Sequence, residues 1–309
     1  MDDNKNISHN LIPIALMGFL FILIHSIALF LIWPFDKAGM QAFEQTDNPL
    51  NLIYIFSIIF IMTLIILIIA KFWKKQLIQF IILGAIGYTI FWVFQPLLLF
   101  ILQLQWQIAF LLSIILAFLL VVILYKFPEW YVIDVCGIIV GAGAIAIFGI
   151  SLGIFLVILL LVGLSIYDAI SVYKTKHMIE LADTVMDLKL PVLLVIPKIR
   201  KYSLIKETKS LKQKLKDGEE RDAFFMGLGD VVMPGILVAA SFNFIENGLP
   251  IAISVIIGTL VGFVILMTFV IKGKPQAGLP CLCGGAIAGY IISSYLLFGK
   301  LVGLTLPSL

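Results

Sequence analysis

Two aspartates, Asp168 and Asp230, lie inside long apolar segments of this chain. Asp168 follows Tyr167, and Asp230 closes the sequence GLGD at residues 227–230. A carboxylate at bilayer depth costs at least about 2.5 kcal/mol, so an ionisable residue in such a segment marks a functional site by default. Two carboxyl groups that meet can share one proton, which leaves one of them as a general base and the other as a general acid. This pair is the candidate chemistry of the chain if the fold brings the two groups together.

The composition identifies the class of protein. With 62% hydrophobic residues, 13% charged residues and a mean hydropathy of +1.14, the sequence predicts a polytopic helical membrane protein in contact with the lipid bilayer. The first apolar stretch, residues 11–33, follows acidic residues and has no small-residue cleavage site, so it indicates a retained span and not a signal peptide. The three cysteines form no C-x-x-C pair and predict neither a disulfide framework nor a metal site.

Nine apolar segments approach the length of about 20 residues that a helix needs to cross the hydrocarbon core. The fifth and sixth have no polar loop between them, and the small residues Gly149, Ser151 and Gly153 offer the place to turn. We therefore predict an all-α protein. The segments are residues 11–33, 50–70, 77–102, 108–125, 131–148, 149–172, 223–244, 249–271 and 277–298.

The basic residues predict the orientation of these spans. With a cytoplasmic N-terminus, 19 of the 21 Lys and Arg residues lie inside, and only Lys37 and Lys300 lie outside. Without the twelve in one long loop, the short segments still hold seven inside against two outside. The net charge of +3 thus reports N-in/C-out topology and implies no nucleic-acid partner. The expected plan is a single membrane domain over residues 1–309, with helices 1–6 in 11–172, a cytoplasmic loop in 173–222 and helices 7–9 in 223–298.

Depth then links the two aspartates. Asp168 lies six residues before Lys174, and Asp230 lies eight residues after Asp222, both counted from the cytoplasmic side. At about 1.5 Å per helical residue, the carboxyl groups are roughly 9 and 12 Å below these charges and can meet at one level. The pair cannot easily ionise twice, because burial and the like charge both disfavour the second negative charge. It would titrate as a unit, so neither residue is assigned permanently as acid or base.

These motifs resemble those of the presenilin and signal peptide peptidase family of intramembrane aspartyl proteases. Tyr167 and Asp168 are similar to the YD motif of that family, and residues 227–230 are similar to its GxGD motif. The order of the motifs, their depth and the nine-span plan extend the resemblance over nearly the whole chain. The N-in orientation is similar to that of presenilin and opposite to that of signal peptide peptidase. The short chain looks most like a microbial, archaeal presenilin homologue.

The ninth span opens with a sequence that resembles the Pro-Ala-Leu element of that family. Leu279 and Pro280 match the element, whereas Ala277 and Gly278 replace its proline and alanine. The resemblance implies an aspartic endopeptidase that cuts transmembrane helices with water, with Asp168 and Asp230 as the catalytic residues. The residues expected to bind substrate or shape the site are Tyr167, Gly227, Leu228, Gly229, Ala277, Gly278, Leu279 and Pro280.

The two glycines of the GLGD sequence also have a physical interpretation. Gly227 and Gly229 remove side chains just before Asp230, which lets another backbone approach and weakens the local helix. The alternative is that they only permit close helix packing, as we expect of the Gly285/Gly289 pair. Tyr167 faces away from Asp168 on the helix and is open to both a site role and a core role.

A transmembrane substrate must unwind before cleavage, because its helix hides the peptide bonds in an internal hydrogen-bond ladder. Residues 190–197 form a β-branched run between two prolines, and we expect this run to be a strand that pairs with the unwound substrate. The alternative is an apolar segment packed at the interface. Downstream, residues 198–220 are rich in lysine and predict a solvated linker.

Two other functions use similar residues. An ion- or proton-coupled secondary transporter could carry its cation on Asp168 and Asp230, but the chain shows no repeat of either motif in its other half. A prepilin-peptidase-like enzyme also has a GxGD motif, but it has fewer helices and lacks a Pro-Ala-Leu-like element. Proteolysis by two aspartates and water needs no cofactor, and the expected partners are single-span transmembrane substrates.

Overall fold

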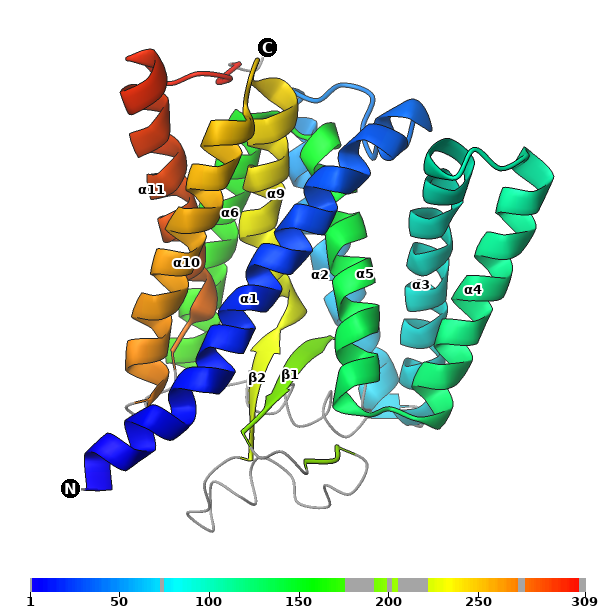
Figure 1. The fold of residues 1–309 in the computed structure, drawn as a ribbon, viewed down its shortest axis with the longest axis horizontal. Coiled ribbons are helices and arrows are strands. Elements are labelled where there is room, and N and C mark those ends of the chain that lie inside the picture. Colours follow the sequence, from blue (N-terminus) through cyan, green and yellow to red (C-terminus); the bar gives the residue numbers. More distant parts are fainter. Residues whose placement is uncertain are drawn as a thin grey trace.

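The computed structural model describes residues 2–72, 75–175, 192–198, 202–204, 222–271 and 276–305. Within these residues the fold consists of nine α-helices, two short π-helical segments and one two-stranded sheet (Figure 1). The helices are α1 (Asp2–Lys37), α2 (Leu50–Phe72), α3 (Lys75–Pro96), α4 (Trp106–Lys126), α5 (Trp130–Ser151), α6 (Ile154–Ile170), α9 (Leu228–Phe244), α10 (Leu249–Ile271) and α11 (Gly278–Phe298). The π-helical segments η1 (Leu97–Ile101) and η2 (Ser171–Thr175) extend α3 and α6, and the strands are β1 (Leu193–Pro197) and β2 (Ala223–Gly227).

Each of the nine predicted apolar segments overlaps one of these helices, so the all-α prediction is confirmed apart from the small sheet. Seven helices in the described part of the chain are long and apolar enough to cross a membrane. Two shorter apolar helices, Leu50–Ile65 and Leu228–Phe244, complete the set. Many large apolar side chains on the outer helices are exposed, which is the surface expected of a protein whose solvent is lipid.

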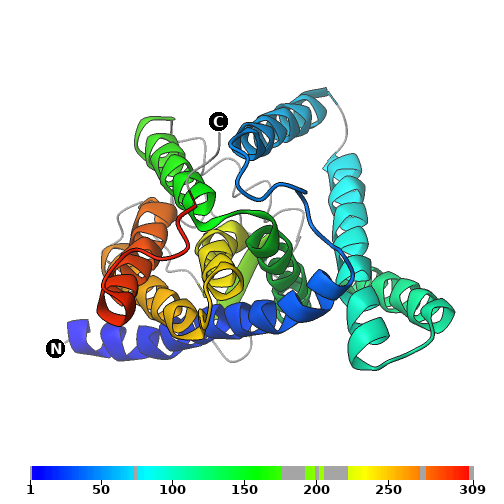
Figure 2. The same ribbon diagram turned by 90° about the horizontal axis from the view of Figure 1, so that it is seen from above.

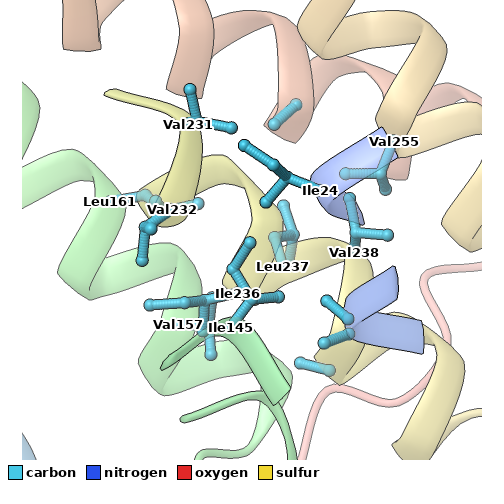
Figure 3. Close-up of a cluster of buried hydrophobic side chains, with 14 of the residues drawn as sticks. Ile24, Ile145, Val157, Leu161, Val231, Val232, Ile236, Leu237, Val238 and Val255 are labelled. Atoms are coloured by element: carbon cyan, nitrogen blue, oxygen red, sulfur yellow. The ribbon is translucent and has the colours of Figure 1, made fainter. Parts of the chain in front are cut away.

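Helix α9 lies at the centre of the bundle. It contacts α1, α5, α6, α10 and α11, and the view from above shows it surrounded by them (Figure 2). Its buried side chains pack against apolar residues of the neighbouring helices, including Ile24, Ile145 and Val255 (Figure 3). The pair α3 and α4 lies at the edge of the molecule, away from this core (Figure 2). The helix that carries Asp230 is therefore held on several sides.

The prediction that a helix begins at residue 223 is wrong. Residues Ala223–Gly227 form strand β2, and the helix begins at Leu228. A short apolar run satisfies the hydropathy of a helix and of a buried strand equally, so the sequence pattern could not separate them. The strand forms because β1 supplies its backbone hydrogen-bond partners, in an antiparallel register that pairs Leu193 with Gly227 and Pro197 with Ala223.

The boundary between the fifth and sixth predicted segments also moves. Helix α5 continues through Gly149, which packs so closely on α9 that an added Cβ would lie 2.2 Å from the Cβ of Ala239. The turn falls instead at Leu152 and Gly153. Gly153 donates its N–H to the carbonyl of Thr46, and an added Cβ there would lie 2.1 Å from a carboxyl oxygen of Asp47. A close tertiary contact therefore decides which small residue makes the turn.

The predicted loop over residues 173–222 is described only in part. Its run 190–197 contains β1, so the prediction of a strand is confirmed for Leu193–Pro197. The predicted solvated linker over residues 198–220 lies outside the described residues except for residues 198 and 202–204. The strand pair lies at the same end of the bundle as the N-terminus (Figure 1).

Helices α10 and α11 cross with their backbones in contact. An added Cβ at Gly258 would lie 2.2 Å from the carbonyl oxygen of Gly285, and one at Gly289 would lie 2.4 Å from the carbonyl oxygen of Ser254. The expectation that Gly285 and Gly289 permit close packing is confirmed. This crossing fixes the start of α11, where Gly278 and Leu279 lie.

We predict that Gly285→Ala lowers the stability of the protein, because its methyl group has no space against the α10 backbone. Overpacking of this kind costs about 1–3 kcal/mol. Gly284→Ala is the matched control, since an added Cβ at this neighbouring residue meets nothing within 4 Å. Thermal unfolding of both variants in detergent is the measurement. Equal melting temperatures would contradict the close backbone contact.

Candidate active site

Asp168 lies two residues before the end of α6 and is only 3% exposed. Its carboxylate accepts the N–H of Leu279, with 3.1 Å between the nitrogen and Oδ2, and it also accepts the N–H of Gly278. These are the first two residues of α11, whose N-cap residue Ala277 offers no side-chain hydrogen bond. Asp168 thus supplies acceptors to amide groups that the first turn of a helix cannot satisfy by itself. A carboxylate of α6 caps the N-terminus of α11.

Asp230 is the third residue of α9 and is partly exposed. Its carboxylate accepts the N–H of Gly227, the N-cap residue of the same helix. An acidic side chain at the third position that reaches back to the N-cap amide is one half of a capping box. The second aspartate, like the first, therefore lies at a helix N-terminus, where the helix dipole favours negative charge.

The two carboxyl groups meet at Gly278. The N–H of this residue points to Asp168, while a Cβ added to it would lie 3.2 Å from Oδ2 and 3.3 Å from Oδ1 of Asp230. The charges of Asp168 and Asp230 also interact directly. Residues 62 positions apart in sequence are thus brought to opposite sides of one glycine, as the depth argument expected. The missing side chain of Gly278 leaves the space between them.

The other residues expected at the site divide into two groups. Gly227 adjoins Asp230, since an added Cβ would lie 3.2 Å from its Oδ2, and Gly229 is exposed with nothing within 4 Å of an added Cβ. Leu228 points elsewhere: its side chain packs on Gly141 of α5. Tyr167 is 61% exposed, on a face of α6 different from that of the buried Asp168.

The start of α11 is built for its position. Ala277 is 2% exposed and Leu279 packs against the core, so both are anchored. Pro280 is the third residue of the helix, where its missing N–H costs no hydrogen bond. Ser165 of α6 donates a long hydrogen bond of 3.4 Å to the carbonyl of Leu279, the residue whose N–H reaches Asp168. Helix α6 therefore bonds both the N–H and the carbonyl of Leu279.

Among the described residues beside the aspartates, β2 has a partner on one edge only, and β1 has a partner on each edge. The N–H of Leu228 bonds to the carbonyl of Val192, and the N–H of Lys198 bonds to the carbonyl of Asp222. In an antiparallel pair, the backbone N–H and C=O groups of alternate residues point to the partner strand. Those of Val195 on β1 and Phe225 on β2 therefore point outward, away from the partner strand. The outer edge of β1 is occupied at Val195, whose N–H donates to Asp134 of α5 at 2.8 Å.

Several contacts were absent from the sequence prediction. Asp134 is 6% exposed and accepts a hydrogen bond from a strand 61 positions away. Ser165 had one local signal, since it precedes Asp168 by three residues and shares its helix face. His25 of α1 contacts α9, with 3.0 Å between its Nε2 and the carbonyl oxygen of Val231.

Comparison with known proteins identifies the family of this chain. The family model described as signal-peptide peptidase, presenilin aspartyl protease matches residues 18–299. A solved structure of a presenilin family intramembrane aspartate protease in space group C222 is 32% identical, with a TM-score of 0.69, and the match covers 92% of this chain and 99% of that one. A structure with the same description in space group P2 is 33% identical, with a TM-score of 0.68 and coverage of 91% and 96%. Curated proteins give no significant match.

The family match extends over both aspartates, the strand pair and the start of α11. This chain belongs to the signal peptide peptidase and presenilin family, and it is a multi-pass membrane enzyme, an intramembrane aspartyl protease.

Proposed function

We propose that Asp168 and Asp230 are the catalytic pair and hydrolyse a peptide bond within a transmembrane helix. The observation that carries this assignment is the placement of both carboxyl groups against Gly278. Each group is also held by backbone amides at a helix N-terminus, which preorganises the pair. A cation carrier has no need of an adjacent open strand edge, so the geometry favours proteolysis over ion-coupled transport.

The reaction follows from one proton shared by the pair. The ionised carboxylate removes a proton from water as the water oxygen bonds to the carbonyl carbon of the substrate. The protonated carboxyl group donates a hydrogen bond, and then its proton, to the carbonyl oxygen. Collapse of the tetrahedral intermediate breaks the C–N bond. The proton taken from water goes to the leaving nitrogen, and one hydroxyl proton of the intermediate returns to the carboxylate that had protonated the carbonyl oxygen. The products are a carboxylic acid and an amine, and the pair returns to its starting state.

The family implies transmembrane substrates, and we propose single-span helices for this enzyme. The cleaved segment must leave its helix, and its freed amide groups need new partners at membrane depth. The outward groups of Phe225 on β2 are suited to this, because β2 leads directly to Asp230 and β1 covers only its other edge. Strand addition at β2 therefore replaces the earlier expectation that the run 190–197 itself pairs with substrate. The open space at Gly229 provides the approach.

We further propose the topology on the charge distribution. All nine helices would cross as one membrane domain, with the N-terminus cytoplasmic and the C-terminus outside. The loop over residues 173–222 and the strand pair would then lie on the cytoplasmic side, and cleavage would occur near that surface. Roles for Tyr167 and Leu228 receive no support from their positions, because one is exposed and the other packs on α5.

Replacing either aspartate tests the catalytic assignment. We predict that Asp168→Asn and Asp230→Asn each lower the cleavage rate of a single-span helical peptide by about 10²–10⁴-fold or more, because an amide cannot take a proton from water. The measurement is product formation by mass spectrometry with purified protein in detergent. Circular dichroism and thermal unfolding report whether each variant keeps its fold. Proteolysis retained in either folded variant rules out the pair, and transport in proteoliposomes without cleavage indicates the transporter.

Gly229 tests the approach of the substrate. We predict that Gly229→Ala folds normally, since the added methyl group meets no atom, and that it lowers kcat/KM by about tenfold because it occupies the space of the substrate backbone. Gly284→Ala serves as the control, being exposed and equally unobstructed on α11. If both alanine variants cleave at the parent rate, Gly229 has only a conformational role.

Cysteine labelling tests the orientation. We predict that Lys300→Cys reacts with a membrane-impermeant maleimide in intact cells, while Lys126→Cys reacts only after the membrane is opened. The parent chain, with its own three cysteines, measures background labelling. The reverse pattern would show a C-terminus on the cytoplasmic side.

A further inference from the structure

A third acidic residue, Asp134 of α5, is buried and has no part in the proposed chemistry. Asp134 is the fifth residue of α5, is 6% exposed, and accepts the N–H of Val195 on its Oδ1 at 2.8 Å. A buried carboxyl group is costly unless it is hydrogen-bonded, so its presence here calls for a use. Its partner is the backbone of β1 and not another side chain. The contact of Asp134 therefore depends on which residue of β1 lies opposite it.

That position is selective. The backbone N–H and C=O groups of Leu194 and Ile196 point to β2. The residues of β1 whose backbone groups point away from β2 are Leu193, Val195 and Pro197. Pro197 has no N–H to donate. If β1 moved by two residues so that Pro197 came opposite Asp134, the carboxyl group would lose its donor. A movement by one residue would turn the side chains of β1 to the wrong face. Asp134 and Pro197 together thus disfavour a two-residue shift of β1 in this direction along α5.

This register is transmitted to Asp230 by successive hydrogen bonds. Asp134 holds β1, β1 pairs with β2 through a five-residue register, and β2 ends at Gly227. Gly227 in turn donates its N–H to the carboxylate of Asp230. The path joins the fixed frame of α5 to the aspartate pair. A shift of the strands along α5 would therefore move the open edge of β2 relative to the two carboxyl groups.

A second acid of α5 holds the chain that follows β1. Glu129, the N-cap residue of α5, accepts the Ser203 hydroxyl on Oε1 at 2.6 Å and the Leu204 N–H on Oε2 at 3.1 Å. Leu204 is 5% exposed and packs against residues of α4 and α5. The described parts of the loop on the C-terminal side of residue 191 are thus attached to the same helix end.

We propose that Asp134 is a positioning residue that sets the register of the strand pair and thereby selects which substrate peptide bond reaches the aspartate pair. The proposal rests on the proposed function, since it assumes that substrate adds to the edge of β2. Helix α5 then serves as the fixed reference that determines where the substrate is cut. A residue that only stabilises the fold would change the amount of active enzyme and leave the position of the cut unchanged.

The test compares Asp134→Asn with Asp134→Ala on a single-span helical peptide, with cut sites read by mass spectrometry. The asparagine oxygen can still accept the Val195 N–H, so this variant should retain the parent cut sites. The alanine variant should add cuts displaced by two residues, the strand repeat, with kcat lowered about 10–100-fold and KM changed less than about threefold. The control is Asp36→Ala, which removes an exposed acidic side chain near the C-terminal end of α1. This variant should cut as the parent does.

Val195→Pro provides a second route to the same loss if the alanine variant fails to fold. It removes the donor and keeps the carboxyl group, at a position facing away from the ladder, where proline is tolerated. It should spread the cut sites as Asp134→Ala does. An unchanged cut pattern in either folded variant, with only less activity, overturns the proposal. Failure of the parent protein to cut the peptide would instead overturn the proposed function.

Discussion

The capping of α11 by Asp168 is the interaction on which the site depends. A carboxylate buried in α6 would be unfavourable by itself, and the first amides of α11 would lack acceptors because Ala277 has no side chain to offer. The Asp168 carboxylate accepts hydrogen bonds from the N–H groups of Gly278 and Leu279. These bonds offset the cost of burying the carboxylate and satisfy the amides of the helix. The same contact that makes Asp168 tolerable also carries Gly278 to Asp230.

The surrounding packing serves this contact. Glycines in α10 and α11 let the two backbones touch, which sets where α11 begins. Helix α9 lies in the middle of the bundle, with its first turn held by the His25 contact to Val231 and by the Gly227 cap. Precision of this kind matters in a protease, because a catalytic pair displaced by about 1 Å can lose about 10²-fold in rate.

The site combines a rigid part with an open one. The aspartates are held by backbone amides, and Ala277 and Leu279 are buried or packed on the core, whereas an added Cβ at Gly229 meets no atom and β2 has a strand partner on one edge only among the described residues. This division suits an enzyme whose substrate must exchange its helical hydrogen bonds for new ones. The backbone of β2 offers those bonds next to the carboxyl groups, and Asp134 prevents the sheet from extending on its other side.

Hydropathy and motif spacing by themselves determined the class of protein, the nine helical segments, the two aspartates and their shared depth, because burial in lipid demands long apolar runs and makes a charge conspicuous. They misjudged residues 223–227, did not reveal the partner of Asp134, and could not tell Gly149 from Gly153 as the turn. Those outcomes depend on partners far along the chain: β1 for β2, Val195 for Asp134, and Ala239 and Asp47 for the two glycines. Only tertiary structure decides them, because a hydrogen bond or a close backbone contact belongs to two segments at once, and sequence pattern reports each segment alone.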